Sequence, residues 1–343
     1  MDLGSLGLGK KQEETFEDAS LRQERAEELH QETIVVDGHQ GTLFDVLYGA
    51  RNLGEEGPGH VDLPRLRKVG VRLSILTAFL ADRRYPRRGV RTGLEYIDAF
   101  RSLGDLPGAM LCTNSDQVEE ARRQDKVGFM LGFEGGEFLD ASIEALRMFA
   151  RQGLRLLTLT WSERNELADG AAESGTRGGL TTFGKNVVRE CGRLGVMVDV
   201  SHISEGGFWD VIDMAEAPIV ASHSNCHAIY GHPRNLTDDQ LKSIAETGGV
   251  VAITLNPEYL AIDGGDITLG TVCDHVLHAL EVAGEDHVAL GSDFDTFTGD
   301  VPLNGVDELP FLTAELLKRG VSGKTLAGVL GGNWMRVIRA ICK

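Results

Sequence analysis

The feature that most constrains the fold of this 343-residue chain is a series of short apolar runs, each bounded by polar or glycine-rich turns. The segments between the runs have the apolar spacing of amphipathic helices, as in residues 142–153, 183–195 and 237–249, the last with Thr237 and Asp238 placed as helix-start residues. Strands that alternate with helices in this way predict an α/β fold, a (β/α)8 barrel with a parallel sheet. The eight expected strands are residues 34–36, 71–79, 127–133, 154–159, 196–200, 218–221, 249–255 and 288–290.

A polar or aromatic side chain follows every expected strand except the second. In a parallel barrel the carboxyl ends of the strands meet at one rim, and functional residues are found there. We therefore expect these side chains to converge on one face of the barrel. They are His39, Glu134, Trp161, His202, His223, Asn256 and Asp293.

Four of these residues have the chemistry of metal ligands. The imidazoles of His39, His202 and His223, together with the carboxylate of Glu134, form a ligand set suited to zinc or a similar divalent ion. Taken singly, each histidine is explained as well by a hydrogen-bonded polar residue at a strand end. The expected convergence of all four favours a metal site at the C-terminal face of the barrel.

Asp293 follows the last expected strand in the segment "GSDFD", and Asp295, two residues further, is expected to point to the same side. A carboxylate beside a metal site is a candidate general base. The alternative is that Asp293 caps the N-terminus of a following helix.

Two further residues are candidates for substrate binding. Arg234 lies in the loop after the sixth expected strand, where a guanidinium can hold a carboxylate through two hydrogen bonds; a salt bridge that braces the loop is the alternative. Trp161 is expected either to wall the substrate pocket or to cap the barrel core. The nearby His227 and His232 are interpreted as structural.

Composition excludes some classes of partner. The formal net charge is −18 and the lysines and arginines are not clustered, which argues against a nucleic-acid partner. The five cysteines are scattered, odd in number and without a C-x-x-C pair, as is typical of a reducing cytoplasm. No apolar run reaches the length of a membrane span, and the N-terminal residues lack the pattern of a signal peptide, so we expect neither export nor membrane anchoring.

The expected domain organisation is simple. Residues 1–31 are acidic and polar and are predicted to form a helical N-terminal extension outside the main core. Residues 32–343 are predicted to form a single barrel domain that carries the catalytic site.

From residue 34 to the C-terminus the chain resembles the renal or membrane dipeptidases, peptidase family M19 of the amidohydrolase-like metal barrels, and in particular a bacterial branch of that family. The resemblance is carried by many blocks in the same order: "DGH", "HVDLPRLRKVGV", "GFEGG", "LTLTW", "NELADG", "GLTTFGKNVVRECGRLGVMVDVSHIS", "PIVASHSN", "HPRNLTDDQL", "GGVVAITLNP", "GSDFD" and "LGGNWMRV".

The resemblance implies a zinc-dependent dipeptidase with two zinc ions bridged by Glu134. It places His202 and His223 on one ion and His39 on the other.

It also implies that Asp293 is the acid/base residue and that Arg234 grips the substrate carboxylate. From their places after the fourth and seventh expected strands, Trp161 and Asn256 are further candidates for substrate binding. A water activated by the metal would attack the peptide carbonyl, and Asp293 would relay the proton to the leaving amine. The expected partner is a small dipeptide-like substrate, and a homodimer is left open.

The chain departs from the family pattern at two positions. The family motif is His-x-Asp, with the aspartate on the same metal as the histidine, whereas this chain reads His39-Gln40-Gly41. We therefore expect one or two zinc ions, with the weaker site beside His39; Asp45 is a candidate replacement ligand. Trp161 stands where the animal enzymes have a substrate-contacting histidine.

The missing ligand keeps two alternatives open. One is an amidohydrolase with a single metal that acts on another amide or a lactam, and the other is a non-catalytic barrel that binds a ligand.

Overall fold

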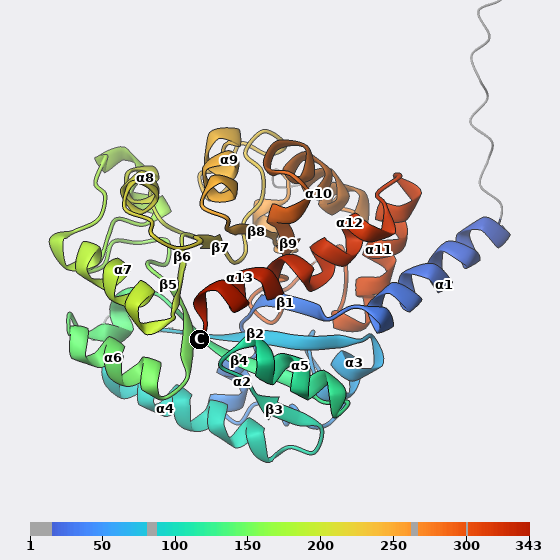
Figure 1. Ribbon diagram of the computed structural model, residues 1–343, viewed down its shortest axis with the longest axis horizontal. Coiled ribbons are helices and arrows are strands. Elements are labelled where there is room, and N and C mark those ends of the chain that lie inside the picture. The colour runs from blue at the N-terminus through green and yellow to red at the C-terminus, as the bar shows by residue number, and fades with distance from the viewer. Residues whose placement is uncertain (1–15, 81–87, 262–266, 300) are drawn as a thin grey trace, which may run out of the picture.

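The computed structural model describes residues 16–80, 88–261, 267–299 and 301–343. Within these residues a parallel sheet runs in the order β1-β2-β4-β5-β6-β7-β8-β9 (Figure 1). The sheet closes between its first and last strands, where Gln40 bridges to Phe294 and the amide of Asp293 donates to the carbonyl of His39 over 2.9 Å. The predicted barrel is confirmed. The strands on this path are β1 Val35–Gln40, β2 Val71–Phe79, β4 Val127–Glu134, β5 Leu154–Thr158, β6 Met197–Asp199, β7 Val220–Ala221, β8 Val250–Ile253 and β9 Val288–Leu290.

Two details of the sheet differ from the prediction. The short strand β3 (Ala109–Leu111) was not expected; it pairs only with β4, off the barrel path. Strand β1 continues to Gln40 instead of ending at Val36. It can do so because Asp37 finds partners inside the protein: its carboxylate accepts hydrogen bonds from the side-chain NH2 group of Gln40 over 2.6 Å and from Ser292.

The amphipathic segments form the predicted helices around the barrel. Helices α6, α7 and α9 are preceded by the N-cap residues Ser142, Thr181 and Thr237, whose side chains accept hydrogen bonds from backbone amides of the first turn. The α-helices are α1 Phe16–Glu32, α2 Leu43–Leu47, α3 Leu63–Lys68, α4 Gly89–Ser102, α5 Ser115–Arg123, α6 Ile143–Arg151, α7 Thr182–Leu194, α8 Glu205–Asp213, α9 Asp238–Glu246, α10 Leu269–Ala283, α11 Leu309–Lys318, α12 Gly323–Ala327 and α13 Asn333–Ile341.

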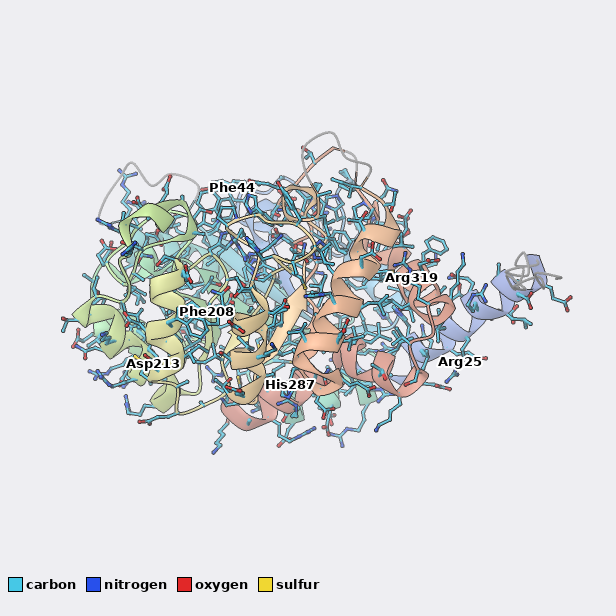
Figure 2. The ribbon with its side chains drawn as sticks, turned by 90° about the horizontal axis from the view of Figure 1, so that it is seen from above. Arg25, Phe44, Phe208, Asp213, His287 and Arg319 are labelled. Carbon is cyan, nitrogen blue, oxygen red and sulfur yellow. The ribbon has the colours of Figure 1, made fainter. Side chains whose placement is uncertain are left out.

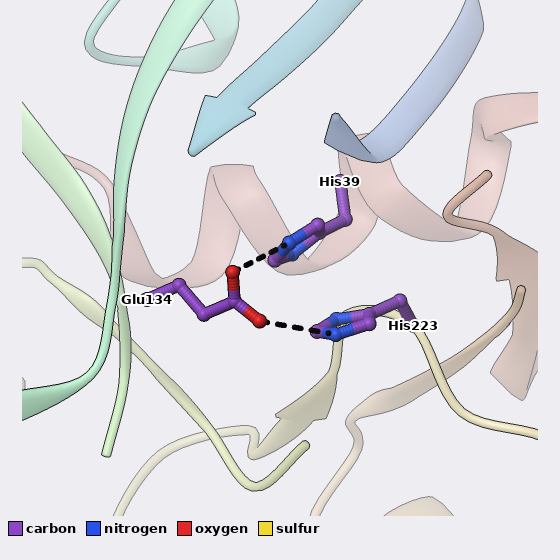
Figure 3. Close-up of side chains that lie close together, drawn as sticks. All are labelled: His39, Glu134 and His223. Carbon is purple, nitrogen blue, oxygen red and sulfur yellow. Dashed lines mark ion pairs between the residues drawn. The ribbon is translucent and has the colours of Figure 1, made fainter. Parts of the chain in front are cut away.

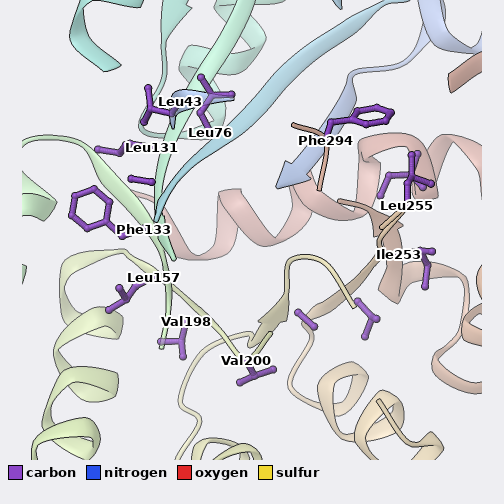
Figure 4. Close-up of a cluster of buried hydrophobic side chains, with 14 of the residues drawn as sticks. Leu43, Leu76, Leu131, Phe133, Leu157, Val198, Val200, Ile253, Leu255 and Phe294 are labelled. Atoms are coloured by element: carbon purple, nitrogen blue, oxygen red, sulfur yellow. The ribbon is translucent and has the colours of Figure 1, made fainter. Parts of the chain in front are cut away.

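Alternate side chains of the strands pack on opposite faces of the sheet. One set packs with the surrounding helices, and Figure 4 shows several of its members beside the strands, including Leu76, Phe133 and Ile253. The other set packs with α13 and takes at least one residue from each strand on the barrel path: Val36, Leu73, Ile75, Met130, Leu156, Met197, Val220, Val250, Ala252 and Ala289.

Helix α13 closes the N-terminal end of the barrel. Arg336 donates to the carbonyls of Gly249 and Asp286, which lie just before β8 and β9. The fully buried Trp334 donates to the carbonyl of Leu290 over 3.0 Å, and a Cβ at Gly38 would lie 2.2 Å from its ring. The interior is therefore filled from this side, which leaves the C-terminal rim for a site.

The molecule seen from above has Phe44, from the segment after β1, on one edge (Figure 2). Asp213, at the end of α8, and His287, at the start of β9, lie on the opposite edge. The two rims of the barrel therefore face opposite sides of the molecule.

Helix α1 runs beside α11 and projects from the barrel (Figure 1). Its Ala26 and Leu29 are buried. The buried His30 ring lies 3.1 Å from the carbonyl of Val69 and 2.8 Å from the hydroxyl of Thr313. The division of the chain at residue 31 stays a prediction. Among the described residues, no helix combines the length and the apolar character that a membrane span requires.

Candidate metal centre

The carboxylate of Glu134, at the end of β4, lies among three imidazoles. Its Oε1 is 3.1 Å from Nε2 of His202 and 3.5 Å from Nε2 of His223, and its Oε2 is 3.6 Å from Nε2 of His39. Figure 3 shows the rings of His39 and His223 against the two carboxylate oxygens. All four side chains are buried. The structure therefore brings together the four residues that the sequence singled out.

Each ring comes from a different strand. His39 lies within β1, whereas His202 and His223 follow β6 and β7. His202 has a left-handed backbone, with φ of +68°, a conformation that non-glycine residues seldom adopt outside functional sites and turns. Its Nε2 lies 2.9 Å from Nε2 of His223. The ring nitrogens thus gather at one point from three directions.

The donor set fits a divalent metal. Ligand atoms of His39, Glu134 and His223 all lie within 4.8 Å of one another, with Nε2 of His202 beside them. Imidazole nitrogen and carboxylate oxygen are ligands that zinc accepts. No structural requirement of the barrel demands three buried imidazoles around one carboxylate, so we interpret the cluster as a metal centre.

Burial and neighbouring charges both shift the pKa values of these groups. Burial would raise the pKa of Glu134, but the neighbouring His39, His202 and His223 hold it well below its usual range. Burial, with the charge of Arg234, lowers the pKa of His202 to about 4, and burial also lowers the pKa of His223. Near neutral pH the cluster therefore offers an ionised carboxylate and at least two neutral rings, the forms that bind metals.

Asp293 lies beyond β9 with φ of +64°, and no helix begins directly after it, so it is not a helix cap. Its Oδ2 accepts a hydrogen bond of 2.8 Å from the side chain of Asn256. Burial and the nearby Glu134 raise its pKa to about 6, against the opposing effect of His39.

Asp295 has different partners from those of Asp293. Its carboxylate accepts hydrogen bonds from the hydroxyl of Thr42, the amide of His60 and the guanidinium of Arg51. Asp295 is therefore held by neighbouring loops, and Asp293 is the carboxylate more available for proton transfer.

Arg234 is buried beside the centre. Its Nη1 donates to the hydroxyl of Ser224 and its Nη2 to the carbonyl of His223, each over 2.6 Å. Its guanidinium lies 5.4 Å from the centre of the Tyr259 ring. Arg234 is not among the residues that line the adjoining cavity. The structure thus places the arginine next to the centre, with the side chain fastened to the backbone of a candidate ligand.

A cavity of about 340 Å³ opens beside the centre. Trp161 and Asn256, both expected from the sequence, contribute to its lining, and the Trp161 ring stacks on His202 with the ring centres 5.9 Å apart. Sequence reasoning missed three aromatic residues of this lining. Tyr259 follows Asn256 in the segment "NPEYL", the only local hint of its position, whereas Phe44 and Phe79 show no sequence signal beyond hydrophobicity.

At Gly41 the first strand supplies no side-chain ligand, as the sequence indicated. Asp45 lines the cavity, but its Oδ2 accepts a hydrogen bond of 2.8 Å from Nε of Arg51. The structure therefore pairs Asp45 with an arginine and does not bring it into the cluster.

A parallel barrel that gathers imidazoles around a buried carboxylate at its open rim belongs to the class of metal-dependent barrel hydrolases. Residues 23–343 match the family model described as membrane dipeptidase, peptidase family M19. The chain belongs to this family, and the resemblance expected from its sequence blocks is confirmed.

Individual relatives agree with this assignment. The chain is 36% identical over 295 residues to the dipeptidase AclJ of Aspergillus oryzae, a match that covers 82% of this chain and 69% of the relative. The solved structure of dipeptidase AC, a metallopeptidase of family M19, has a TM-score of 0.83 at 29% identity, over 90% of this chain and 99% of that one. A metallopeptidase from Rhodobacter sphaeroides, liganded with a phosphinate mimic of the dipeptide L-Ala-D-Ala, has a TM-score of 0.81 with the same identity and coverage.

Proposed function

We propose that this protein is a zinc-dependent dipeptidase that hydrolyses small unblocked dipeptides. The observation that carries the proposal is the cluster of Glu134 with His39, His202 and His223 beside a cavity of about 340 Å³. The family match and the dipeptidase relatives support the same reaction. The R. sphaeroides relative binds a dipeptide mimic, which supports a dipeptide as the substrate class here.

Glu134, His39, His202 and His223 would hold the zinc. Bound there, zinc would act as a Lewis acid toward the peptide carbonyl and lower the pKa of a water molecule. The family's second ligand on the first strand is missing at Gly41, so we propose that the position beside His39 is the weaker one. In agreement with this, Nε2 of His39 lies 3.0 Å from the hydroxyl of Thr77, a neutral partner.

Asp293 would transfer the proton during hydrolysis. Its carboxyl faces the cavity, it is oriented by the side-chain amide of Asn256, and its pKa is raised to about 6. A group with a pKa close to the working pH can both accept a proton from water and return it to the leaving amine.

Arg234 would bind the free carboxylate of the dipeptide. Two of its nitrogens are fastened to Ser224 and to the His223 carbonyl, whereas Nε is buried and makes no hydrogen bond with the described residues. A buried guanidinium with an unused donor favours an anionic partner. Because Arg234 does not line the cavity, we expect the Tyr259 ring, which it contacts, to shift when substrate binds.

Neither the amidohydrolase with a single metal nor the non-catalytic barrel is favoured by the family match and the dipeptidase relatives. A cytoplasmic location remains part of the proposal, supported by the five cysteines, all buried and none in a disulfide.

The experiment is a steady-state assay of the zinc-loaded protein on L-Ala-D-Ala, L-Ala-L-Ala and their C-terminally amidated forms. We expect hydrolysis of the free dipeptides, a large rise in KM on amidation and a similar rise in Arg234→Ala. Arg336→Ala is the matched control, since that arginine also donates to backbone carbonyls but lies at the opposite end of the barrel. Preference for amidated substrates would refute the role of Arg234, and absence of hydrolysis of all four would refute the dipeptidase proposal.

A further inference from the structure

Two buried aspartates of the barrel strands hold serines in the same way. Asp199, the last residue of β6, accepts hydrogen bonds from the amide of Ser222 over 2.9 Å and from its hydroxyl over 2.6 Å. Asp37, in β1, accepts the corresponding bonds from the amide and hydroxyl of Ser292 over 2.8 and 2.5 Å. The barrel thus contains one arrangement twice, and the two copies can be compared.

Only the Ser222 copy reaches the metal centre. The hydroxyl oxygen of Ser222 lies 2.9 Å from Nδ1 of His39 and 2.8 Å from Nδ1 of His223. The two imidazole rings lie against each other, with centroids 3.7 Å apart. Asp199, Ser222, His39 and His223 are all completely buried, so water does not compete for these bonds.

A count of hydrogens fixes the direction of each bond. The carboxylate of Asp199 is surrounded by donors: the amides of Ser201 and Ser222 reach Oδ1, and the hydroxyls of Thr158 and Ser222 reach Oδ2. A serine hydroxyl has one hydrogen and two lone pairs. Because the hydrogen of Ser222 goes to Asp199, its oxygen is left to accept an N–H from each of the two imidazoles.

From this geometry we propose that Ser222, aligned by Asp199, is a positioning residue that sets the tautomer of both His39 and His223. Each ring carries its hydrogen on Nδ1 and presents Nε2 toward Glu134, 3.6 Å away for His39 and 3.5 Å for His223. The hydroxyl of Thr77, 3.0 Å from Nε2 of His39, is then the donor to that nitrogen. One hydroxyl therefore prepares two ligand nitrogens at once. The consequence for metal binding rests on the proposed function, whereas the tautomers can be tested without any metal.

The third imidazole is constrained differently: Nε2 of His202 lies 2.9 Å from Nε2 of His223, which carries no hydrogen in this arrangement, and 3.1 Å from Oε1 of Glu134, so without a metal the hydrogen of His202 lies on Nε2. Nδ1 of His202 lies 3.2 Å from the hydroxyl of Ser162, which can either donate or accept. His202 can therefore change its tautomer when a metal binds, whereas His39 and His223 are already prepared. A fixed tautomer is what the hydrogen-bond partners of ligand histidines provide in known metal sites.

Asp199→Asn is the most direct test. Oδ1 of Asp199 faces two backbone amides, so in the variant the amide oxygen should stay there and the NH2 group should face the hydroxyl of Ser222. Ser222 would then receive a hydrogen from Asn and direct its own toward an imidazole. At least one of the two rings should move its hydrogen from Nδ1 to Nε2, away from the metal-binding form.

The tautomers are read from 15N NMR of histidine-labelled, zinc-free protein, with the signals assigned through His39→Gln and His223→Gln. The zinc affinity is measured by titration against a chelator. We expect Nδ1–H on both rings in the parent protein, and an Nε2–H form on one ring in Asp199→Asn. We expect zinc affinity to fall about 10- to 100-fold in Asp199→Asn and in Ser222→Ala. Ser292→Ala, which removes the matching hydroxyl from Asp37, should keep both the tautomers and the affinity of the parent protein.

The outcomes separate this inference from the proposed function. If the parent protein binds zinc and hydrolyses dipeptides but carries Nε2–H on either ring, or if folded Ser222→Ala binds zinc as tightly as the parent protein, the inference is overturned and the function stands. If the parent protein fails to bind zinc but shows Nδ1–H on both rings, the tautomer assignment stands and the function fails. If Asp199→Asn does not fold, the parent spectrum and Ser222→Ala decide.

Discussion

Introducing an aspartate at position 41 tests directly whether the first strand lacks a metal ligand. Gly41 follows β1, and its amide donates to the carbonyl of Phe294 over 2.9 Å. Its backbone is outside the left-handed region, so an L side chain is tolerated there. The obstacle is steric, because a Cβ at this position would lie 2.5 Å from the methyl carbon Cγ2 of Thr296.

The size of the steric penalty follows from this distance. Carbon atoms in contact normally lie about 3.5–4.0 Å apart, so the methyl group and the new side chain must separate by about 1 Å. Overpacking of this kind typically costs about 1–3 kcal/mol. We expect Gly41→Asp to lower the free energy of unfolding by about that amount.

A second substitution removes the obstacle without disturbing the site. Thr296→Ser deletes only the methyl group and keeps the hydroxyl that donates to the carbonyl of Asp293 over 2.7 Å. The double variant Gly41→Asp/Thr296→Ser should therefore recover most of the lost stability. Urea unfolding of both single variants and the double variant, analysed as a double-mutant cycle, measures the coupling between the two positions.

Zinc titration by calorimetry then tests the ligand count. With a carboxylate beside His39, the second zinc ion gains a charged ligand in place of water, and zinc usually takes four ligands. We expect the second zinc ion to bind more tightly to the double variant than to the parent protein. Thr296→Ser alone should bind zinc as the parent protein does. Two equally tight events in the parent protein, or no tighter event in a folded double variant, would refute the reasoning.

Three further changes test other parts of the structure. Burial lowers the pKa of His30 to about 4, so between pH 6.5 and 4 the unfolded chain binds a proton at this residue more readily than the folded protein does. The free energy of unfolding should therefore fall by up to about 3 kcal/mol as the pH is lowered through this range. In urea titrations, His30→Gln should make the free energy of unfolding less dependent on pH. Asp293→Asn should lower kcat at least about a hundredfold while elemental analysis finds unchanged zinc. His202→Ala should lose zinc under mild chelation, and a stoichiometry equal to that of the parent protein would contradict the ligand assignment.

The fold was predictable because the strands of a barrel leave a local signature. Buried apolar runs that end in residues such as Glu134 and His223 show both where a strand lies and which end faces the functional rim. Strand β3 is not followed by such a residue and pairs only with β4, off the barrel path, which explains why it was missed. Strand β1 was expected to stop early because Asp37 and Gln40 are polar, and the Ser292 partner of Asp37 lies far along the chain, after the last strand.

The site, like the fold, could be predicted only where its residues leave a local signal in the sequence. His39, Glu134, His202 and His223 could be selected because metal ligands are a small set of residue types at recognisable positions. The hydroxyl of Ser222 is not distinctive in a sequence. Its position between two imidazoles depends on closure of the barrel, which brings His39 of β1 beside the segment that follows β7.

The question of Asp45 shows most clearly what the sequence could not decide. From spacing alone, a carboxylate four residues beyond Gly41 is a reasonable substitute ligand. Whether it is available depends on Arg51, which binds Asp45 on one side and Asp295 on the other. Two carboxylates near Gly41 are thus paired with one guanidinium. Moving either into the metal centre would leave that buried cation with one partner fewer, so the missing ligand is not replaced by a small local rearrangement.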